Sequence, residues 1–321
     1  MFPSRRQAAL GLIAATAAGS AARAGPPPAE LPDVPNEDPI EVGASRDLFE
    51  HLLAPVTING QGPFQFLLDT GANGSCISRA LVARLMLPAA AGVRVRTVVG
   101  NHDRPGVLVD RLQVGDRSRK DVQVAALPLT DSLDGVLGVD WLKGQRLELG
   151  FKARSVAITR SRDDVPAKGT VVVAARRRLG QLTIVDADLS GRRISAMIDS
   201  GSQMSMCNSA LRDLLIETNG RKGIVTTSQR IRLESLVGET FWGEMLYLPF
   251  MRLGGLQMGN VPVVCSDAQI FELWGLQGKP AVALGMDLLT QFDSVALDFG
   301  RSQVRFDGAE SQPALPNFKP V

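Results

Sequence analysis

Two stretches decide the fold: "FQFLLDTGANGSCIS", which runs from Phe64 to Ser78, and "RISAMIDSGSQMSMC", which runs from Arg193 to Cys207. Each is an apolar, strand-like run that ends in Asp, followed by Thr or Ser and then by Gly. A single triplet of this kind is typical of a turn, in which Asp caps the loop and Gly takes a positive φ. The same setting occurs twice, however, so we compared the two halves with Asp69 placed on Asp199.

The two halves of the chain match in order well beyond these stretches. "VVGNHDRPG" (98–106) matches "LVGETFWGE" (236–244), and "LQVGD" (112–116) matches "LQMGN" (256–260). Farther on, "GVLGVDWLKGQRLELGFKARSV" (135–156) matches "VALGMDLLTQFDSVALDFGRSQV" (282–304). The ordered matches indicate a tandem duplication of one β-rich unit of about 120–140 residues.

Composition narrows the possible functions. The chain has 321 residues, of which 45% are apolar and 21% charged, enough for one large core or two ordinary ones. A net charge of +2 gives no indication of a nucleic-acid partner. Two histidines and three cysteines are too few to predict a His-based or thiolate metal site, and we expect no cofactor. We expect Cys76, Cys207 and Cys265 to be buried thiols, because a domain of this size does not need disulfides.

The first 24 residues are typical of an export signal. Arg5 and Arg6 precede an Ala-rich apolar run of 15 residues, and "ARA" (22–24) is a small-x-small cleavage site. The run is too short to span a bilayer stably, and the paired arginines resemble a twin-arginine signal. We therefore expect a periplasmic or secreted protein with no stable membrane span. The remaining expected parts are a Pro-rich tether at 25–45, lobes at 46–161 and 170–307, and a tail at 308–321.

Local signals predict a few individual elements. The Asn59–Gly60 pair lies between two β-rich runs and predicts a tight hairpin. The segment Ser78 to Pro88 predicts a helix that Ser78 caps and Pro88 bounds. Asp140 and Asp287 each follow an apolar-apolar-Gly segment, and we interpret them as helix N-caps.

With these motifs in place, the sequence resembles the aspartic proteases: retropepsin-like units fused as two lobes, as in the pepsin type. The motifs are "DTGA" (69–72), "DSGS" (199–202), "VLG" (136–138) and "ALG" (283–285). The resemblance implies an all-β, bilobal acid-protease fold, made of two tandem retropepsin-like β-barrel lobes with a few short helices. It implies that Asp69 and Asp199 are catalytic. The residues that it implies as supports of the active-site loops are Thr70, Gly71, Ser200, Gly201, Gly138 and Gly285.

Physical chemistry explains why such a site needs two carboxyl groups. Two carboxylates about 3 Å apart cannot both ionise cheaply, so they share one proton. The ionised group can then take a proton from water while the protonated group donates to the substrate carbonyl. We predict an aspartic endopeptidase that binds a polypeptide in extended form. The alternative is a non-catalytic peptide-binding protein that keeps the fold. We expect a monomer, because two unlike halves can pair internally; lobes that pair with another chain are the alternative.

Each half is also expected to cover one side of the cleft. We predict two flaps, one with Val99 and Gly100 at its tip and one with Val237 and Gly238; plain surface hairpins are the alternative. We interpret His102 as a solvated loop residue; a place on a flap is the alternative. Position 72 is Ala, whereas its repeat equivalent is Ser202. The resemblance implies that the Ser202 hydroxyl donates a hydrogen bond toward the catalytic carboxylate, which would lower the pKa of that carboxylate.

Overall fold

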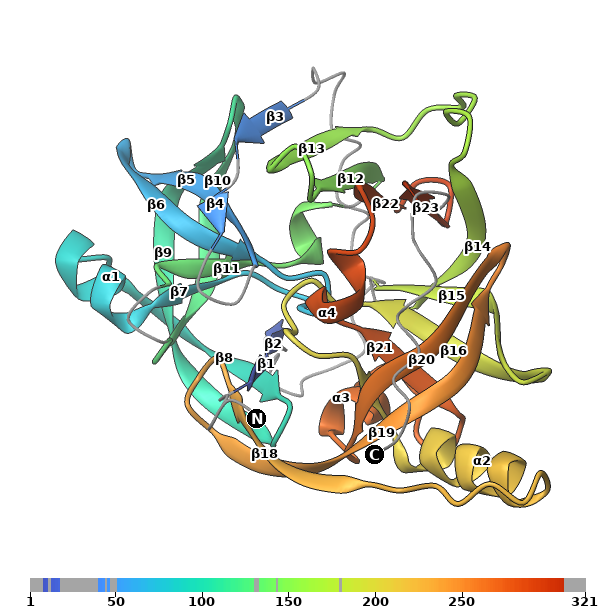
Figure 1. The fold of residues 1–321 in the computed structure, drawn as a ribbon. Helices are drawn as coiled ribbons and strands as arrows, with labels where there is room; N and C mark the ends of the chain where they lie inside the picture. The colour runs from blue at the N-terminus through green and yellow to red at the C-terminus, as the bar shows by residue number, and fades with distance from the viewer. Residues whose placement is uncertain are drawn as a thin grey trace, which may run out of the picture.

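The computed structural model describes residues 8–10, 13–17, 40–43, 45–46, 51–129, 133–142, 144–178 and 181–308. Two β-barrels and a sheet that joins them make up this part of the chain (Figure 1). Residues 308–321, the predicted tail, lie outside the described residues except for Gly308. The fold is therefore all-β and bilobal, as the sequence predicts.

Six strands form the barrel of the first lobe. They are β5 (Leu52–Ile58), β6 (Gln61–Leu68), β7 (Cys76–Ser78), β9 (Asn101–Val114), β10 (Arg117–Leu127) and β11 (Gly135–Leu137). The ring closes because β9 pairs with β10 on one side and with β5 on the other. The other elements of this lobe are β4 (Ser45–Arg46), α1 (Arg79–Leu85), β8 (Ala89–Thr97) and the 3-10 turn η1 (Val139–Trp141).

The second lobe repeats this arrangement element by element. Its barrel strands are β15 (Gln181–Leu189), β16 (Arg192–Ile198), β17 (Met206–Cys207), β19 (Thr240–Leu253), β20 (Leu256–Cys265) and β21 (Ala281–Leu284). β19 closes the ring by pairing with β20 and β15. The other elements are α2 (Ser209–Gly220), β18 (Gln229–Ser235), α3 (Gln269–Leu273) and α4 (Met286–Leu289). Helix α3 has no counterpart among the described residues of the first lobe.

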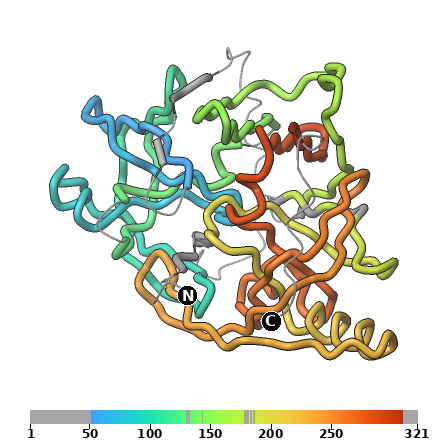
Figure 2. Tube along the Cα trace, in the orientation of Figure 1, coloured from blue at the N-terminus to red at the C-terminus, as the bar shows by residue number. Residues whose placement is uncertain are grey.

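A six-stranded sheet joins the lobes. In order, its strands are β3 (Ile40–Gly43), β13 (Ser155–Arg160), β12 (Gln145–Gly150), β22 (Ser294–Asp298), β23 (Gln303–Asp307) and β14 (Val171–Arg178). At its centre β12 from the first repeat pairs antiparallel with β22 from the second, with Leu147 opposite Leu297 and Leu149 opposite Val295. The strand positions of the two repeats thus exchange across a pseudo-twofold axis. Figure 2 shows the barrel of the first half on the left and that of the second half on the right.

Two short strands lie within the predicted export signal. β1 (Ala8–Leu10) pairs parallel with β18, and β2 (Ile13–Ala17) pairs antiparallel with β8. Both partners are strands of the predicted flap hairpins. Within the described residues, no helix is long and apolar enough to cross a membrane.

The predicted hairpin turn and the predicted helix of the first lobe are confirmed. Asn59 and Gly60 have φ values of 51° and 77°, the left-handed conformation that a two-residue hairpin turn requires. The Ser78 side chain accepts a hydrogen bond from the Leu81 amide at 3.1 Å and so caps α1. The helix ends at Met86 in the left-handed conformation, two residues before Pro88.

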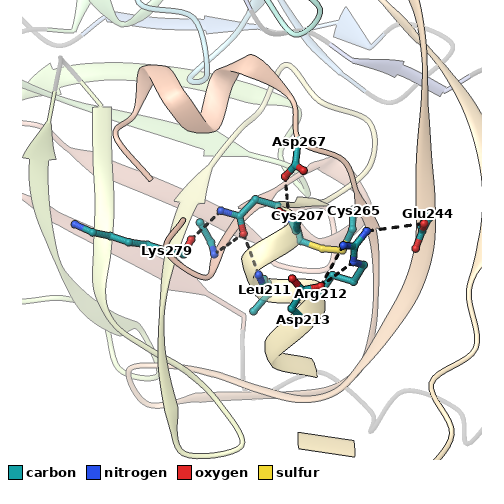
Figure 3. Close-up of a disulfide and its surroundings, with 11 residues drawn as sticks. Cys207, Leu211, Arg212, Asp213, Glu244, Cys265, Asp267 and Lys279 are labelled. Atoms are coloured by element: carbon teal, nitrogen blue, oxygen red, sulfur yellow. Dashed lines mark hydrogen bonds and ion pairs between the residues drawn. A yellow bond between two sulfur atoms is a disulfide. The ribbon is translucent and has the colours of Figure 1, made fainter. Parts of the chain in front are cut away.

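The prediction that all three cysteines are thiols is wrong for two of them. Cys207 on β17 and Cys265 on β20 are directly opposite in a parallel pair, with Cα atoms 4.3 Å apart, and they form a disulfide (Figure 3). The register of two strands 58 residues apart sets this pairing, and nothing local in the sequence reports it. Cys76 is a buried free thiol, as predicted.

Candidate active site

The two strand-end aspartates lie at the centre of the molecule. Asp69 directly follows β6 and Asp199 directly follows β16. Their exposed fractions are 2% and 0%. The Asp69 amide donates to the Leu137 carbonyl at 3.0 Å, and the Asp199 amide donates to the Leu284 carbonyl at 2.9 Å. Each of these leucines is the residue immediately before the glycine of its apolar-apolar-Gly segment. The two repeats therefore fix their aspartates in the same way.

Four hydrogen bonds lock the two aspartate loops together. The Thr70 amide donates to Ser200 Oγ at 3.1 Å, and the Ser200 amide donates to Thr70 Oγ1 at 3.0 Å. Thr70 Oγ1 donates to the Ile198 carbonyl at 2.9 Å, and Ser200 Oγ donates to the Leu68 carbonyl at 2.7 Å. All four bonds cross between lobes and are buried, so each loop holds the other in register.

Close approach explains three of the predicted glycines. A Cβ at Gly201 would lie 2.3 Å from Asp69 Cγ. A Cβ at Gly138 would lie 2.8 Å from the Ala72 carbonyl oxygen, and one at Gly285 would lie 2.5 Å from the Met204 carbonyl carbon. Real Cβ atoms essentially never come this close to backbone or a fixed carboxyl group. These glycines are required by contact, because none of the three has a positive φ.

In each of the two carboxyl groups, only one oxygen accepts hydrogen bonds from the described residues. Asp69 Oδ1 accepts from the amides of Gly71 at 2.8 Å and Ala72 at 3.0 Å, and Asp199 Oδ1 accepts from the Gly201 amide at 3.2 Å. Each Oδ2 is buried and receives no hydrogen bond from the described residues. Burial raises the pKa of both carboxyls well above the ordinary value, and the neighbouring charge of Asp199 raises that of Asp69 further. The arrangement suits a pair that holds one proton between two groups.

A second pair of aspartates supports the loops, but not as the helix N-caps that we predicted. Asp140 lies inside η1 and Asp287 inside α4, whose N-cap residues are Gly138 and Gly285. Asp140 Oδ1 accepts from Ser75 Oγ at 2.8 Å, and Asp287 Oδ1 accepts from Ser205 Oγ at 2.8 Å.

Each serine hydroxyl also accepts a backbone bond, from the Gly138 amide at 3.1 Å and from the Gly285 amide at 3.0 Å. These contacts tie the end of each aspartate loop to the segment behind it. The N-cap prediction was wrong because each turn begins one residue before the aspartate, at Val139 and Met286, so the aspartate lies inside the turn.

The expectation for Ser202 is also wrong. Its hydroxyl donates to the Met204 carbonyl of its own loop at 2.7 Å, so it is turned away from the dyad. Ala72, its repeat equivalent, is fully buried in an apolar cluster. The difference between Ala and Ser at this position therefore gives the dyad no unequal hydrogen bond.

Two hairpins reach across the molecule. One joins β8 to β9 and the other joins β18 to β19, and in Figure 1 the β18–β19 hairpin extends along the lower edge to β8. At the first tip Val99 is exposed and Gly100 half-buried; at the second, Val237 is half-buried and Gly238 is exposed with a φ of 78°. The buried tip residues are the preceding ones, Val98 at 2% and Leu236 at 3% exposed.

The tip of each hairpin packs against the opposite lobe, which we did not predict from the sequence. Val98 belongs to an apolar cluster of the second lobe that includes Phe271 of α3, and its carbonyl accepts from the Gln269 amide at 3.1 Å. Leu236 belongs to an apolar cluster of the first lobe that includes Ala72. The signal was present in the sequence: both repeats place an apolar residue immediately before the Val-Gly of the tip.

Our interpretation of His102 as a solvated loop residue is wrong. It lies on β9, its side chain is 33% exposed, and its Nε2 atom lies 2.6 Å from Glu239 Oε1 of the second hairpin. Glu239 is a further residue that the sequence did not single out. It contacts the first hairpin across a separation of 142 residues, through Thr97 Oγ1 at 2.6 Å.

Within the described part of the chain, no group of three or more His, Cys, Asp or Glu side chains could hold a metal ion.

Comparison with known proteins agrees with this geometry. A family model described as "Aspartyl protease" matches residues 54–141 and 185–288, one segment in each lobe. The two matches contain Asp69 and Asp199, and together they cover more than half of the chain. A search of curated proteins returns no match. The chain therefore belongs to the aspartyl protease family.

Proposed function

We propose that the protein is an aspartic endopeptidase whose single active site consists of Asp69 and Asp199. The observation that carries the proposal is the pair itself. Two buried carboxyls with raised pKa values are held by one interlobe hydrogen-bond set, and each has an Oδ2 atom that receives no hydrogen bond from the described residues. Buried carboxyls with displaced pKa values mark sites of acid–base chemistry.

The reaction follows from one shared proton. The ionised carboxylate takes a proton from a water molecule, whose oxygen attacks the carbonyl carbon of the peptide bond. The protonated carboxyl gives its proton to the carbonyl oxygen, which forms a tetrahedral diol. When the C–N bond breaks, the amine nitrogen takes the proton that came from water, and a diol hydroxyl returns the other proton. The dyad ends as it began, with one proton.

The proposed substrate is a polypeptide in extended form. Strands β8 and β18 of the two hairpins each pair on one side with a hairpin partner, and the other side pairs with a short strand from residues 8–17. These sides can therefore pair with an extended chain. A non-catalytic peptide-binding protein would have no need of two buried carboxyls held this closely, because burial of a carboxyl is costly.

We propose a monomer that is exported. The pairing of β12 with β22 and the interlocked aspartate loops bring both halves of the dyad together within one chain. The Cys207–Cys265 disulfide favours an oxidising compartment, in agreement with the predicted signal at residues 1–24. Replacing both Arg5 and Arg6 by Lys should retain the precursor in the cell if the twin-arginine route is used, and unchanged export would indicate the general secretory route.

The test of the proposed function is cleavage of a mixed peptide library, analysed by mass spectrometry with and without pepstatin. We expect internal cleavage that pepstatin inhibits. The control is the Asp69→Asn protein in the same assay, which should give no products. Binding of library peptides without cleavage, by the parent protein, would instead indicate the non-catalytic alternative.

A further inference from the structure

The tips of the two hairpins are joined by one polar cluster centred on Glu239. Thr97 Oγ1 donates to Glu239 Oε2 at 2.6 Å, and His102 Nε2 lies 2.6 Å from Oε1. The Arg104 guanidinium is 4.0 Å from Oε1. All three partners belong to the first hairpin, and Glu239 belongs to the second. A single carboxylate of the second lobe thus lies beside three side chains of the first and accepts a hydrogen bond from one of them, Thr97.

This cluster is not repeated by the pseudo-twofold axis. The repeat equivalent of Glu239 is Asn101, and the repeat equivalent of His102 is Thr240. Asn101 and Thr240 are both exposed. The backbones of the two tips differ as well: the Thr97 amide donates to the Gly100 carbonyl, three residues on, whereas the Ser235 amide donates to the Glu239 carbonyl, four residues on, both at 2.8 Å. Three residues separate β8 from β9 and four separate β18 from β19. The two tips therefore differ both in length and in the side chains that they present.

The site of the cluster gives it influence over the dyad. Directly beside it, Val98 and Leu236 each lie in the apolar cluster of the opposite lobe. The cluster of Leu236 includes Ala72, three residues after Asp69, and Met204, five residues after Asp199, packs against the cluster of Val98. Movement of the tips would therefore change the packing around both aspartate loops. Glu239 is 19% exposed, so its contacts are only partly screened by water.

We propose that Glu239 is a positioning residue: its carboxylate fixes the first hairpin against the second and so holds both tips closed over the dyad during catalysis. This rests on the proposed peptidase function. Because the contact is made by one carboxylate, substrate can enter when that contact opens, and catalysis proceeds when it has formed again. Glu239 acts through Thr97, His102 and Arg104, and it touches neither the substrate nor the reacting atoms.

The experiment compares Glu239→Ala and Glu239→Gln with a matched control, Asp103→Asn. Asp103 forms an ion pair with Arg94 at 3.0 Å, also in the first hairpin, but the pair is exposed and stays within one lobe. Two measurements are made on each full-length protein: kcat and KM for one library-derived peptide, and hydrogen–deuterium exchange of the tip segments 97–102 and 235–240.

For Glu239→Ala we expect kcat to fall about tenfold, roughly the effect of losing one charge-assisted hydrogen bond. Exchange should rise in both tips together while the barrel strands keep their protection, which also shows that the variant is folded. Glu239→Gln should recover much of kcat, because its amide oxygen can accept from Thr97 Oγ1. Asp103→Asn should match the parent in both measurements.

The proposal is overturned if Glu239→Ala changes tip exchange and kcat no more than Asp103→Asn does. It is also overturned if exchange rises only in segment 235–240, because the two tips would then not depend on each other. Should the parent protein cleave no peptide at all, the proposed function fails, and the exchange measurement still decides whether Glu239 joins the tips.

Discussion

The aspartate loops and the hairpin tips, the floor and the roof of the proposed active site, differ in symmetry. The floor consists of the aspartate loops 69–75 and 199–205, where hydrogen bonds of one repeat have counterparts in the other, down to the Ser75–Asp140 and Ser205–Asp287 pairs. The roof consists of the tips 97–102 and 235–240, which differ in the length of the turn and in side chains, since Glu239 of the second tip holds Thr97 of the first. Two groups that share one proton must be held in matching positions, whereas a cover can differ between its two sides.

The largest effect is expected from breaking the floor at its centre. Asp69→Asn and Asp199→Asn should each lower kcat by at least about a thousandfold, because each removes one member of the acid–base pair. Steady-state kinetics, with circular dichroism to show that the fold is kept, measures this. Retention of more than a few per cent of the parent kcat by either variant would rule out the shared-proton mechanism.

A smaller but still large effect is expected from a single methyl group in the floor. In Gly201→Ala the new Cβ meets the Asp69 carboxyl, so that group must shift. Misplacement by about 1 Å costs on the order of a hundredfold in rate. Gly220→Ala is the matched control, because a Cβ there, in α2, has nothing within 4 Å. Equal kcat/KM values for the two variants would contradict the contact.

Compared with these changes, pH should alter stability more modestly. Burial raises the pKa of Asp199 in the folded state, so the stability contributed by the protonated group is complete below the unfolded pKa of about 3.9 and is lost as pH rises through the folded pKa. Asp199→Asn removes that loss. The variant should therefore be more stable than the parent at pH 7, with the difference shrinking toward pH 4.

Urea unfolding of both proteins at a series of pH values measures this difference. The control is Asp103→Asn, which should gain no stability, because Arg94 lowers the pKa of exposed Asp103. A stability difference between Asp199→Asn and the parent that is the same at every pH would mean that the pKa of Asp199 is not raised by burial.

The smallest effect is expected at position 202, which is Ser where the equivalent position 72 of the first repeat is Ala. Ser202→Ala should leave the acidic limb of the kcat/KM profile in place, because the Ser202 hydroxyl donates to the Met204 carbonyl and not to the dyad. A shift of that limb to higher pH would show that the hydroxyl does stabilise the ionised carboxylate.

The contrast between the aspartate loops and the hairpin tips also explains which features could be predicted from the sequence. The repeat, the strand-end aspartates and the glycines that pack against the aspartate loops could be predicted, because the strict geometry of these loops keeps similar residues in both halves. The disulfide depends on the register of β17 with β20, which no local pattern reports. Glu239 and His102 could not be paired from sequence, since they meet only where the tips cross between lobes. The direction of the Ser202 hydroxyl is a rotamer choice that sequence does not fix.

The central claim is that one chain contributes both halves of one acid–base pair. Mixing the Asp69→Asn and Asp199→Asn proteins tests it most directly. If the lobes pair within a chain, every active site in the mixture lacks one aspartate, and the mixture should be as inactive as either variant alone at any concentration. Peptide cleavage that appears on mixing and grows with protein concentration would show that lobes of different chains form the site, and would contradict the account.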